Sequence, residues 1–184
     1  MRISKDLADR ILFAGPVSAA SSGLFLAVPE ATLAVLREDL PRELAGRDAI
    51  VIYARPSPHS DPGDTIFDAV RSALDKHKSV VAALGGLDKV GLARGVTLAA
   101  ALSALSLHTG KIIALVIDDA HLVTSTENGI VTMFALKAAR DALNLSRELH
   151  GLRVVAMSSD ADKLARLRNG SDQAFFLAPL LVLG

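Results

Sequence analysis

The 184-residue sequence contains no cysteine and no tryptophan, a single tyrosine and only 4% aromatic residues. Without cysteine the chain has no disulfides, no thiolate nucleophile and no cysteine-ligated zinc, which fits a reducing compartment. With so few aromatic residues the core must be built from Ala, Val, Ile and Leu, a composition that suits helices layered on a parallel sheet. A chain of this length predicts one domain with a substantial core.

Neither charge is in excess, because 20 basic residues balance 20 acidic ones. The net charge therefore gives no indication of binding to nucleic acid or to an anionic membrane. No apolar run approaches the roughly 20 residues that span a bilayer, and the N-terminus lacks a signal-peptide pattern. We expect a cytoplasmic protein with no membrane association and no evident nucleic-acid binding. The 51% hydrophobic fraction and the apolar tail Leu177–Leu183 point to a protein partner or a homo-oligomer.

The strongest local signal is a short apolar run, Ile112–Ile117, that ends in the carboxylates Asp118 and Asp119. Such a run predicts a buried strand at the centre of a parallel sheet. Because ligands bind at the carboxyl ends of strands in these sheets, both carboxylates are expected in a functional site. A strand followed by an acidic helix cap is the alternative interpretation.

Strands and helices alternate along the rest of the chain. Residues 1–22 are interpreted as a lead-in segment and loop, and residues 79–95 have no firm assignment. The expected strands are Leu24–Val28, Ala49–Ala54, Ile112–Ile117, Leu152–Met157 and a last one within Phe175–Leu183. The expected helices cover about 32–41, 64–78, 96–108, 130–149 and 161–167, the second capped by Asp64 and the third ended by Gly110. This order predicts a three-layer α/β/α sandwich with a mainly parallel sheet, whose central strand lies between Leu24–Val28 and Leu152–Met157.

The sequence LVIDDAH at the central strand and VVAMSSDADKLARL at the next resemble a P-loop ATPase of the AAA+ or STAND type. The resemblance covers most of the chain, residues 1–184, as a single P-loop NTPase-like domain without an evident C-terminal lid. It implies that Asp118 holds the water shell of Mg²⁺. It also implies that Asp119 is the catalytic carboxylate that polarises the attacking water, although aspartate is shorter than the usual glutamate.

The same resemblance implies a polar cofactor-binding residue at Ser158 or Ser159. It further places Arg166 or Arg168 in the region from which an arginine finger is often presented to a neighbouring subunit, with Arg168 as the expected cofactor-binding residue. A solvated helix face is the alternative interpretation for both arginines.

The first half of the chain lacks the G-x-x-x-x-G-K-[ST] loop with which this family holds phosphate. If the loop follows the strand Leu24–Val28, only Thr32 offers a suitable hydroxyl to the cofactor. No lysine is present there, and Glu30 would face the phosphates. Both features weaken nucleotide binding through the same electrostatic interaction.

A second register places the loop at residues 15–22, after the run Ile11–Ala14. There Ala20 and Ser21 replace the second glycine and the lysine, and only Ser22 matches. The first register is favoured because a helix and the next strand then follow at the expected distance.

These features predict a degenerate AAA+/STAND-like ATPase domain that binds ATP and magnesium weakly or not at all and acts as an interaction or regulatory module. An active Mg-dependent ATP-binding hydrolase with an unorthodox phosphate loop is the alternative, so enzymatic activity stays open at this stage.

Two other chemistries use the same residues. A metallohydrolase would combine the aspartate pair with His121, His59 and Asp61, but the histidines lack paired ligand spacing. A Ser-His-Asp arrangement would use Ser158, His121 and Asp118, but no G-x-S-x-G motif is present.

Overall fold

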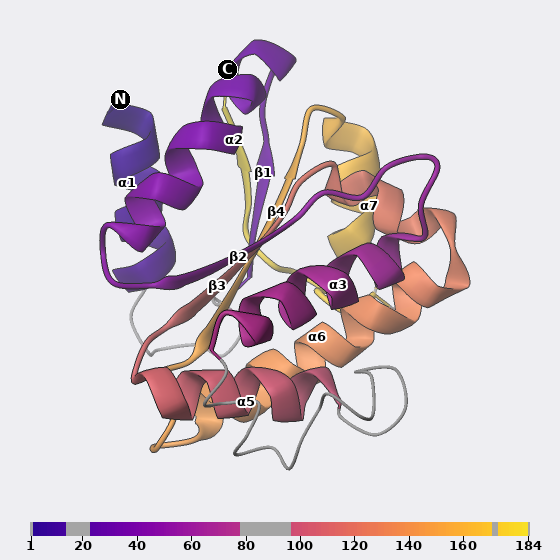
Figure 1. Ribbon diagram of the computed structural model, residues 1–184. Coiled ribbons are helices and arrows are strands. Elements are labelled where there is room, and N and C mark those ends of the chain that lie inside the picture. Colours follow the sequence, from indigo (N-terminus) through magenta and orange to yellow (C-terminus); the bar gives the residue numbers. More distant parts are fainter. Residues whose placement is uncertain (1, 14–22, 78–96, 171–172, 184) are drawn as a thin grey trace.

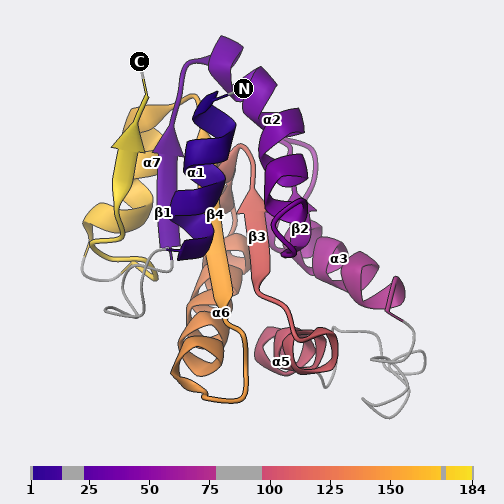
Figure 2. The ribbon, with the colours of Figure 1, turned by 90° about the vertical axis from the view of Figure 1, so that its left-hand side faces the viewer.

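The computed structural model describes residues 2–13, 23–77, 97–170 and 173–183. The helices are α1 (Arg2–Phe13), α2 (Glu30–Ala45), α3 (Pro62–Asp75), α5 (Leu98–Thr109), the 3-10 helix η3 (Ala120–Ser125), α6 (Glu127–Leu145) and α7 (Ala161–Asn169). The strands are β1 (Gly23–Ala27), β2 (Ile50–Ala54), β3 (Ile113–Ile117), β4 (Leu152–Ser158) and β5 (Leu180–Val182). All strand pairs are parallel, in the order β2-β3-β4-β1-β5 (Figure 2).

The sheet is covered on both faces, as the apolar composition of its strands predicts. Successive side chains of a strand point to opposite faces. Leu24 and Leu26 of β1 belong to the core under α1 and α2, whereas Phe25 belongs to the core under the helices α3, α5, α6 and α7 of the other face (Figure 1). Because β3 is buried at every position, it must lie inside this sandwich. The predicted three-layer α/β/α architecture is confirmed.

The order of the strands differs from the expectation in one respect. β4 lies between β3 and β1, and the other neighbour of β3 is β2. The predicted pairing of β3 with β4 is confirmed, but the prediction that β3 is the central strand with β1 as its other neighbour is wrong, because β4 is the middle strand. The apolar pattern identified each strand, but the connections that set the order contain no such periodicity.

Residues 2–13 form a helix rather than a simple lead-in. Leu7, Ala8, Ile11 and Leu12 of α1 are buried in the core between this helix, α2 and the sheet. Spacings of three and four residues place them on one helical face. Ile11 therefore belongs to a helix and not to a strand, so the second loop register lacks the strand that should precede it. Residues 15–22 and 79–95 lie outside the described residues.

Two predicted helix signals had different outcomes. Gly110 has φ 67° and ends α5 in the left-handed conformation, as expected. The cap of α3 is Asp61 rather than Asp64, because Asp61 accepts hydrogen bonds from the amides of Gly63 and Asp64. Within the described parts of the chain, no helix combines the length and the hydropathy needed to cross a membrane.

Candidate functional site

The junction between β1 and α2 is very short. β1 ends at Ala27 and α2 begins at Glu30, so only Val28 and Pro29 lie between them. The amide of Val28 still donates to the carbonyl of Ser158, and the carbonyl of Pro29 already accepts from the amide of Leu33. A loop of about eight residues of the G-x-x-x-x-G-K-[ST] type does not fit this junction. Thr32, the predicted cofactor ligand, lies half-buried in the first turn of α2.

Asp118 stands where β3 ends, and its carboxylate is fully buried. Its amide donates to Ala54 of β2 at 2.9 Å, which fixes it against the neighbouring strand end. Its Oδ2 accepts from Arg37 Nε at 2.7 Å and from Tyr53 Oη at 2.8 Å. Its Oδ1 accepts from the amide of Asp119 at 2.9 Å. Each carboxylate oxygen of Asp118 thus has a donor from the protein itself.

Asp119 turns the chain from β3 into η3. Its φ of 48° and ψ of 37° lie in the left-handed region, which aspartate tolerates better than most residues. The carboxylate lies 3.3 Å from Arg37 Nη2 and 3.2 Å from Arg55 Nε. Asp118 and Asp119 therefore form the predicted carboxylate pair at the edge of the sheet. The cations beside them are Arg37 and Arg55 of the chain itself.

Arg37 reaches this pair from α2. Its Nη1 also contacts Glu30 Oε1 at 2.6 Å, two helical turns earlier. Burial by itself lowers the pKa of Arg37, but its hydrogen bonds to Asp118 and Glu30 outweigh this and raise it. The hydrogen bonds of Glu30 to Arg37 and Ser159 lower the pKa of its carboxyl. Glu30 thus orients Arg37 as well as occupying the start of α2.

Three residues of this cluster, Arg37, Tyr53 and Arg55, were not predicted from the sequence. Tyr53 is the last residue but one of β2 and Arg55 follows that strand directly, next to β3, so polar side chains at this strand end were a usable signal. Arg37 gave none, because a charged residue within an amphipathic helix is typical of a solvated face.

Ser158 and His121 form a second, separate contact. Ser158 is fully buried at the end of β4, and its Oγ lies 2.8 Å from His121 Nδ1. The same oxygen accepts from the amide of Asp160. The hydrogen bonds of Asp118 go to other groups, so the third member of a Ser-His-Asp arrangement is not in place.

Arg168 lies at the end of α7 and holds the chain that leads into β5. Its Nε donates to the carbonyl of Ala178, and its Nη1 lies 3.1 Å from Asn169 Oδ1. Arg166 is exposed. The structure thus brings Asp118 and Asp119 together and gives Ser158 and Arg168 other partners; the nucleotide-binding roles of Thr32, Ser158 and Arg168 stay predictions.

The metallohydrolase alternative has no support in the geometry. Among the residues with described positions, no three His, Asp or Glu side chains are placed to hold a metal ion. Asp61 caps α3 and accepts from Asn128, and His121 contacts Ser158.

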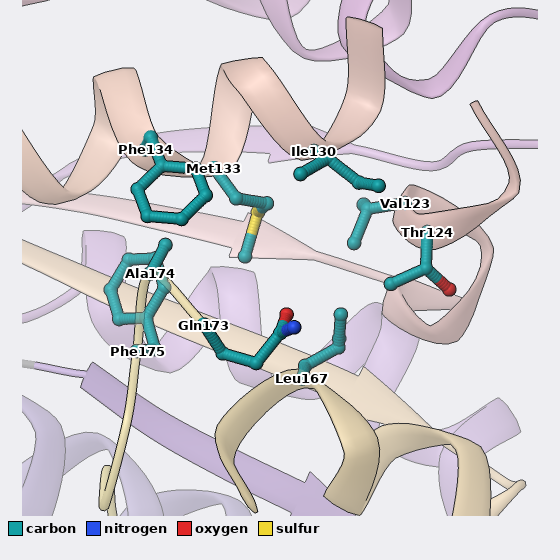
Figure 3. A pocket seen from close by; sticks show the side chains of 9 residues that line it. All are labelled: Val123, Thr124, Ile130, Met133, Phe134, Leu167, Gln173, Ala174 and Phe175. Atoms are coloured by element: carbon teal, nitrogen blue, oxygen red, sulfur yellow. The ribbon is translucent and has the colours of Figure 1, made fainter. Parts of the chain in front are cut away.

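An apolar hollow lies between η3, α6, α7 and the segment 173–175. Figure 3 shows its lining, which consists of Val123, Thr124, Ile130, Met133, Phe134, Leu167, Gln173, Ala174 and Phe175. None of these side chains ionises near neutral pH, so the hollow offers packing rather than chemistry.

Comparison with known proteins adds a fold relationship. The sequence matches no protein-family model and no curated protein. The Walker-type ATPase of Pyrococcus abyssi is similar in structure with a TM-score of 0.61 at 12% identity, over 98% of this chain and 52% of that one. The ORC2 protein of Aeropyrum pernix, solved in ADPNP–ADP complexes, gives a TM-score of 0.63 at 14% identity, over 99% and 47%.

The ORC1 protein of Aeropyrum pernix, solved in complex with DNA, gives a TM-score of 0.53 at 14% identity, over 100% of this chain and 43% of that one. The chain spans about half the length of these structures. At such low identity the similarity establishes the fold alone, and this chain has a P-loop NTPase-like fold.

Proposed function

We propose that this chain is an AAA+-like domain that does not hydrolyse ATP and serves as an interaction or regulatory module. The main observation that supports this proposal is that β1 leads directly into α2 through Val28 and Pro29. In a P-loop enzyme the backbone amides of a long loop at this place surround the phosphates, and a lysine reaches their outer oxygens. Here the helix starts at once, with a carboxylate at its first position.

The energetic consequence follows from the missing donors. Each charge-assisted hydrogen bond lost to phosphate costs roughly 1.5 to 3 kcal/mol, or about one to two orders of magnitude in affinity. Glu30 would repel the phosphates at the N-terminus of α2, where the helix dipole would otherwise favour an anion. Binding of ATP with magnesium is therefore proposed to be weak or absent.

A protein partner or a second copy of the chain is proposed as what the module binds. Apolar side chains exposed on α6 and before β5 support this: Ile130, Val131, Phe134, Phe176 and Leu177. The balanced charge supports a protein in preference to nucleic acid. DNA binding, seen in the Aeropyrum pernix ORC1 structure, is not part of this proposal.

Calorimetry with ATP and magnesium, together with a phosphate-release assay, tests the proposal. We expect no saturable heat and no turnover for the wild type, and the same for Glu30→Gln, because removing one repulsive charge does not create a loop. Micromolar affinity with turnover abolished by Asp119→Asn would establish the alternative, an active hydrolase with an unorthodox phosphate loop.

A further inference from the structure

The carboxylate pair at the end of β3 does not fit a divalent metal ion as it stands. Mg²⁺ requires near-octahedral oxygen ligands whose lone pairs point at the ion. Asp118 is fully buried, and its two oxygens accept from Arg37, Tyr53 and the amide of Asp119. A metal at this carboxylate would have to displace donors that the chain itself supplies.

We propose that Arg37 is a permanent internal counter-cation of Asp118 and Asp119, which takes the place of a metal ion and closes the carboxylate pair to divalent cations. Its guanidinium touches both carboxylates, with Nε at 2.7 Å from Asp118 and Nη2 at 3.3 Å from Asp119. This inference rests on the end of β3, whereas the proposed function rests on the start of α2, so each can fail alone.

Burial identifies Arg37, and not Arg55, as the residue that closes the site. The side chain of Arg37 is 17% exposed, whereas that of Arg55 is 54% exposed and lies 3.3 Å from Asp118 and 3.2 Å from Asp119. A poorly hydrated, planar guanidinium suits a buried ion pair better than an ammonium group does. Removing such a partner leaves a buried charge without compensation, which the fold must neutralise in another way.

Glu30 holds the guanidinium of Arg37 from the same helix, α2. It is 62% exposed, yet its Oε1 lies 2.6 Å from Arg37 Nη1. The guanidinium therefore has acceptors on three sides, two from the end of β3 and one from its own helix. The cation is placed by α2, and its ion pairs connect α2 to the end of β3 without any ligand.

Manganese titration without nucleotide tests the closed site, with free Mn²⁺ followed by electron paramagnetic resonance. The full chain is compared with Arg37→Ala, with Arg37→Ala/Asp118→Asn, and with Arg42→Ala as the matched control. Arg42 lies on the same helix but is exposed and pairs only with Asp39 among the contacts identified.

We expect no Mn²⁺ binding by the wild type or Arg42→Ala. In Arg37→Ala we expect measurable binding, with an affinity at least about tenfold above the upper limit that the titration sets for the wild type, an effect of about 1.4 kcal/mol that is lost again in the double variant. Added Mg²⁺ should raise the Tm of Arg37→Ala and leave that of the wild type unchanged. If Arg37→Ala does not fold, Arg37→Met keeps the apolar stem of the side chain and takes its place.

Two results would overturn the inference. Tight Mn²⁺ binding by the wild type that Asp118→Asn removes would show that the pair is already open to metal. A folded Arg37→Ala or Arg37→Met variant without any gain in Mn²⁺ binding would show that Arg37 does not occupy the place of a cation. Neither result changes the expectation for ATP, which the phosphate-release assay decides separately.

Discussion

Tyr53 is the only tyrosine of the chain, and the chain has no tryptophan, so the tyrosinate absorbance reports on this one side chain and its contact with Asp118. Burial and the hydrogen bond to Asp118 raise the pKa of Tyr53 above its ordinary value of 10.0. Since the folded state holds this proton more tightly, its contribution to stability is complete below pH 10 and is lost as the pH rises further.

A pH titration of tyrosinate absorbance checks this expectation. The native protein should show no ionisation at pH 10, and the signal should appear at higher pH or on unfolding. The control is the same titration in denaturant, where Tyr53 should ionise near 10. A native midpoint at the ordinary value would contradict the hydrogen bond to Asp118.

At the scale of single elements, Asp61 fixes the start of α3. Burial raises the pKa of its carboxyl, but hydrogen bonds from the Asp64 amide, Thr126, Asn128 and the Gly63 amide outweigh burial and lower it. Its contribution to stability is therefore present above the ordinary value of 3.8 and is lost as the pH falls below it.

Asp61→Ala should cost about 0.5 to 2 kcal/mol at neutral pH, the usual cost of losing an N-cap. Its stability should also fall less steeply with acid than that of the wild type. Asp64→Ala is the matched control, since Asp64 accepts only from Asn128 in the described contacts. Chemical denaturation at neutral and acidic pH measures both, and an equal loss in the two variants would contradict the assignment of the cap.

Gly129 lets η3 approach the first turn of α6. A Cβ at this position would lie 2.2 Å from the carbonyl oxygen of Val123, which is backbone and cannot rotate away. Gly129→Ala should therefore destabilise the fold by about 1 to 3 kcal/mol or more, as overpacking does. Gly46→Ala is the control, because its Cβ would meet Arg42 O at 3.3 Å and its φ is −63°. Similar melting temperatures for the two variants would argue against this close approach.

At the scale of the whole molecule, the segment before β5 is expected to support self-association. Leu177 is 67% exposed and has a φ of 58°. Leu177→Asn should weaken association without loss of stability, because asparagine is polar and tolerates positive φ. Leu107→Asn, at an exposed position of α5, is the control. Light scattering over a concentration series measures both variants, and a wild type that stays monomeric throughout would contradict the prediction.

Patterns in the sequence predicted the strands, their alternation with helices and the aspartate pair at the end of β3. Each of these depends on the spacing of apolar residues within a few turns or strand positions, which is readable from a short stretch. The end of α5 at Gly110 was likewise local, because one glycine at the close of an apolar helix is a sufficient signal.

The contacts of the aspartate pair could not be predicted, because they come from distant parts of the chain. Arg37 is 81 residues from Asp118 in the sequence. The two meet because α2 packs on one face of the sheet and β3 contributes side chains to that same face. The helical character of residues 2–13 was similarly hidden, since its four buried residues are covered only when α1 packs against α2 and the sheet. Contacts of this kind depend on the packing of distant elements, and no local pattern encodes that packing.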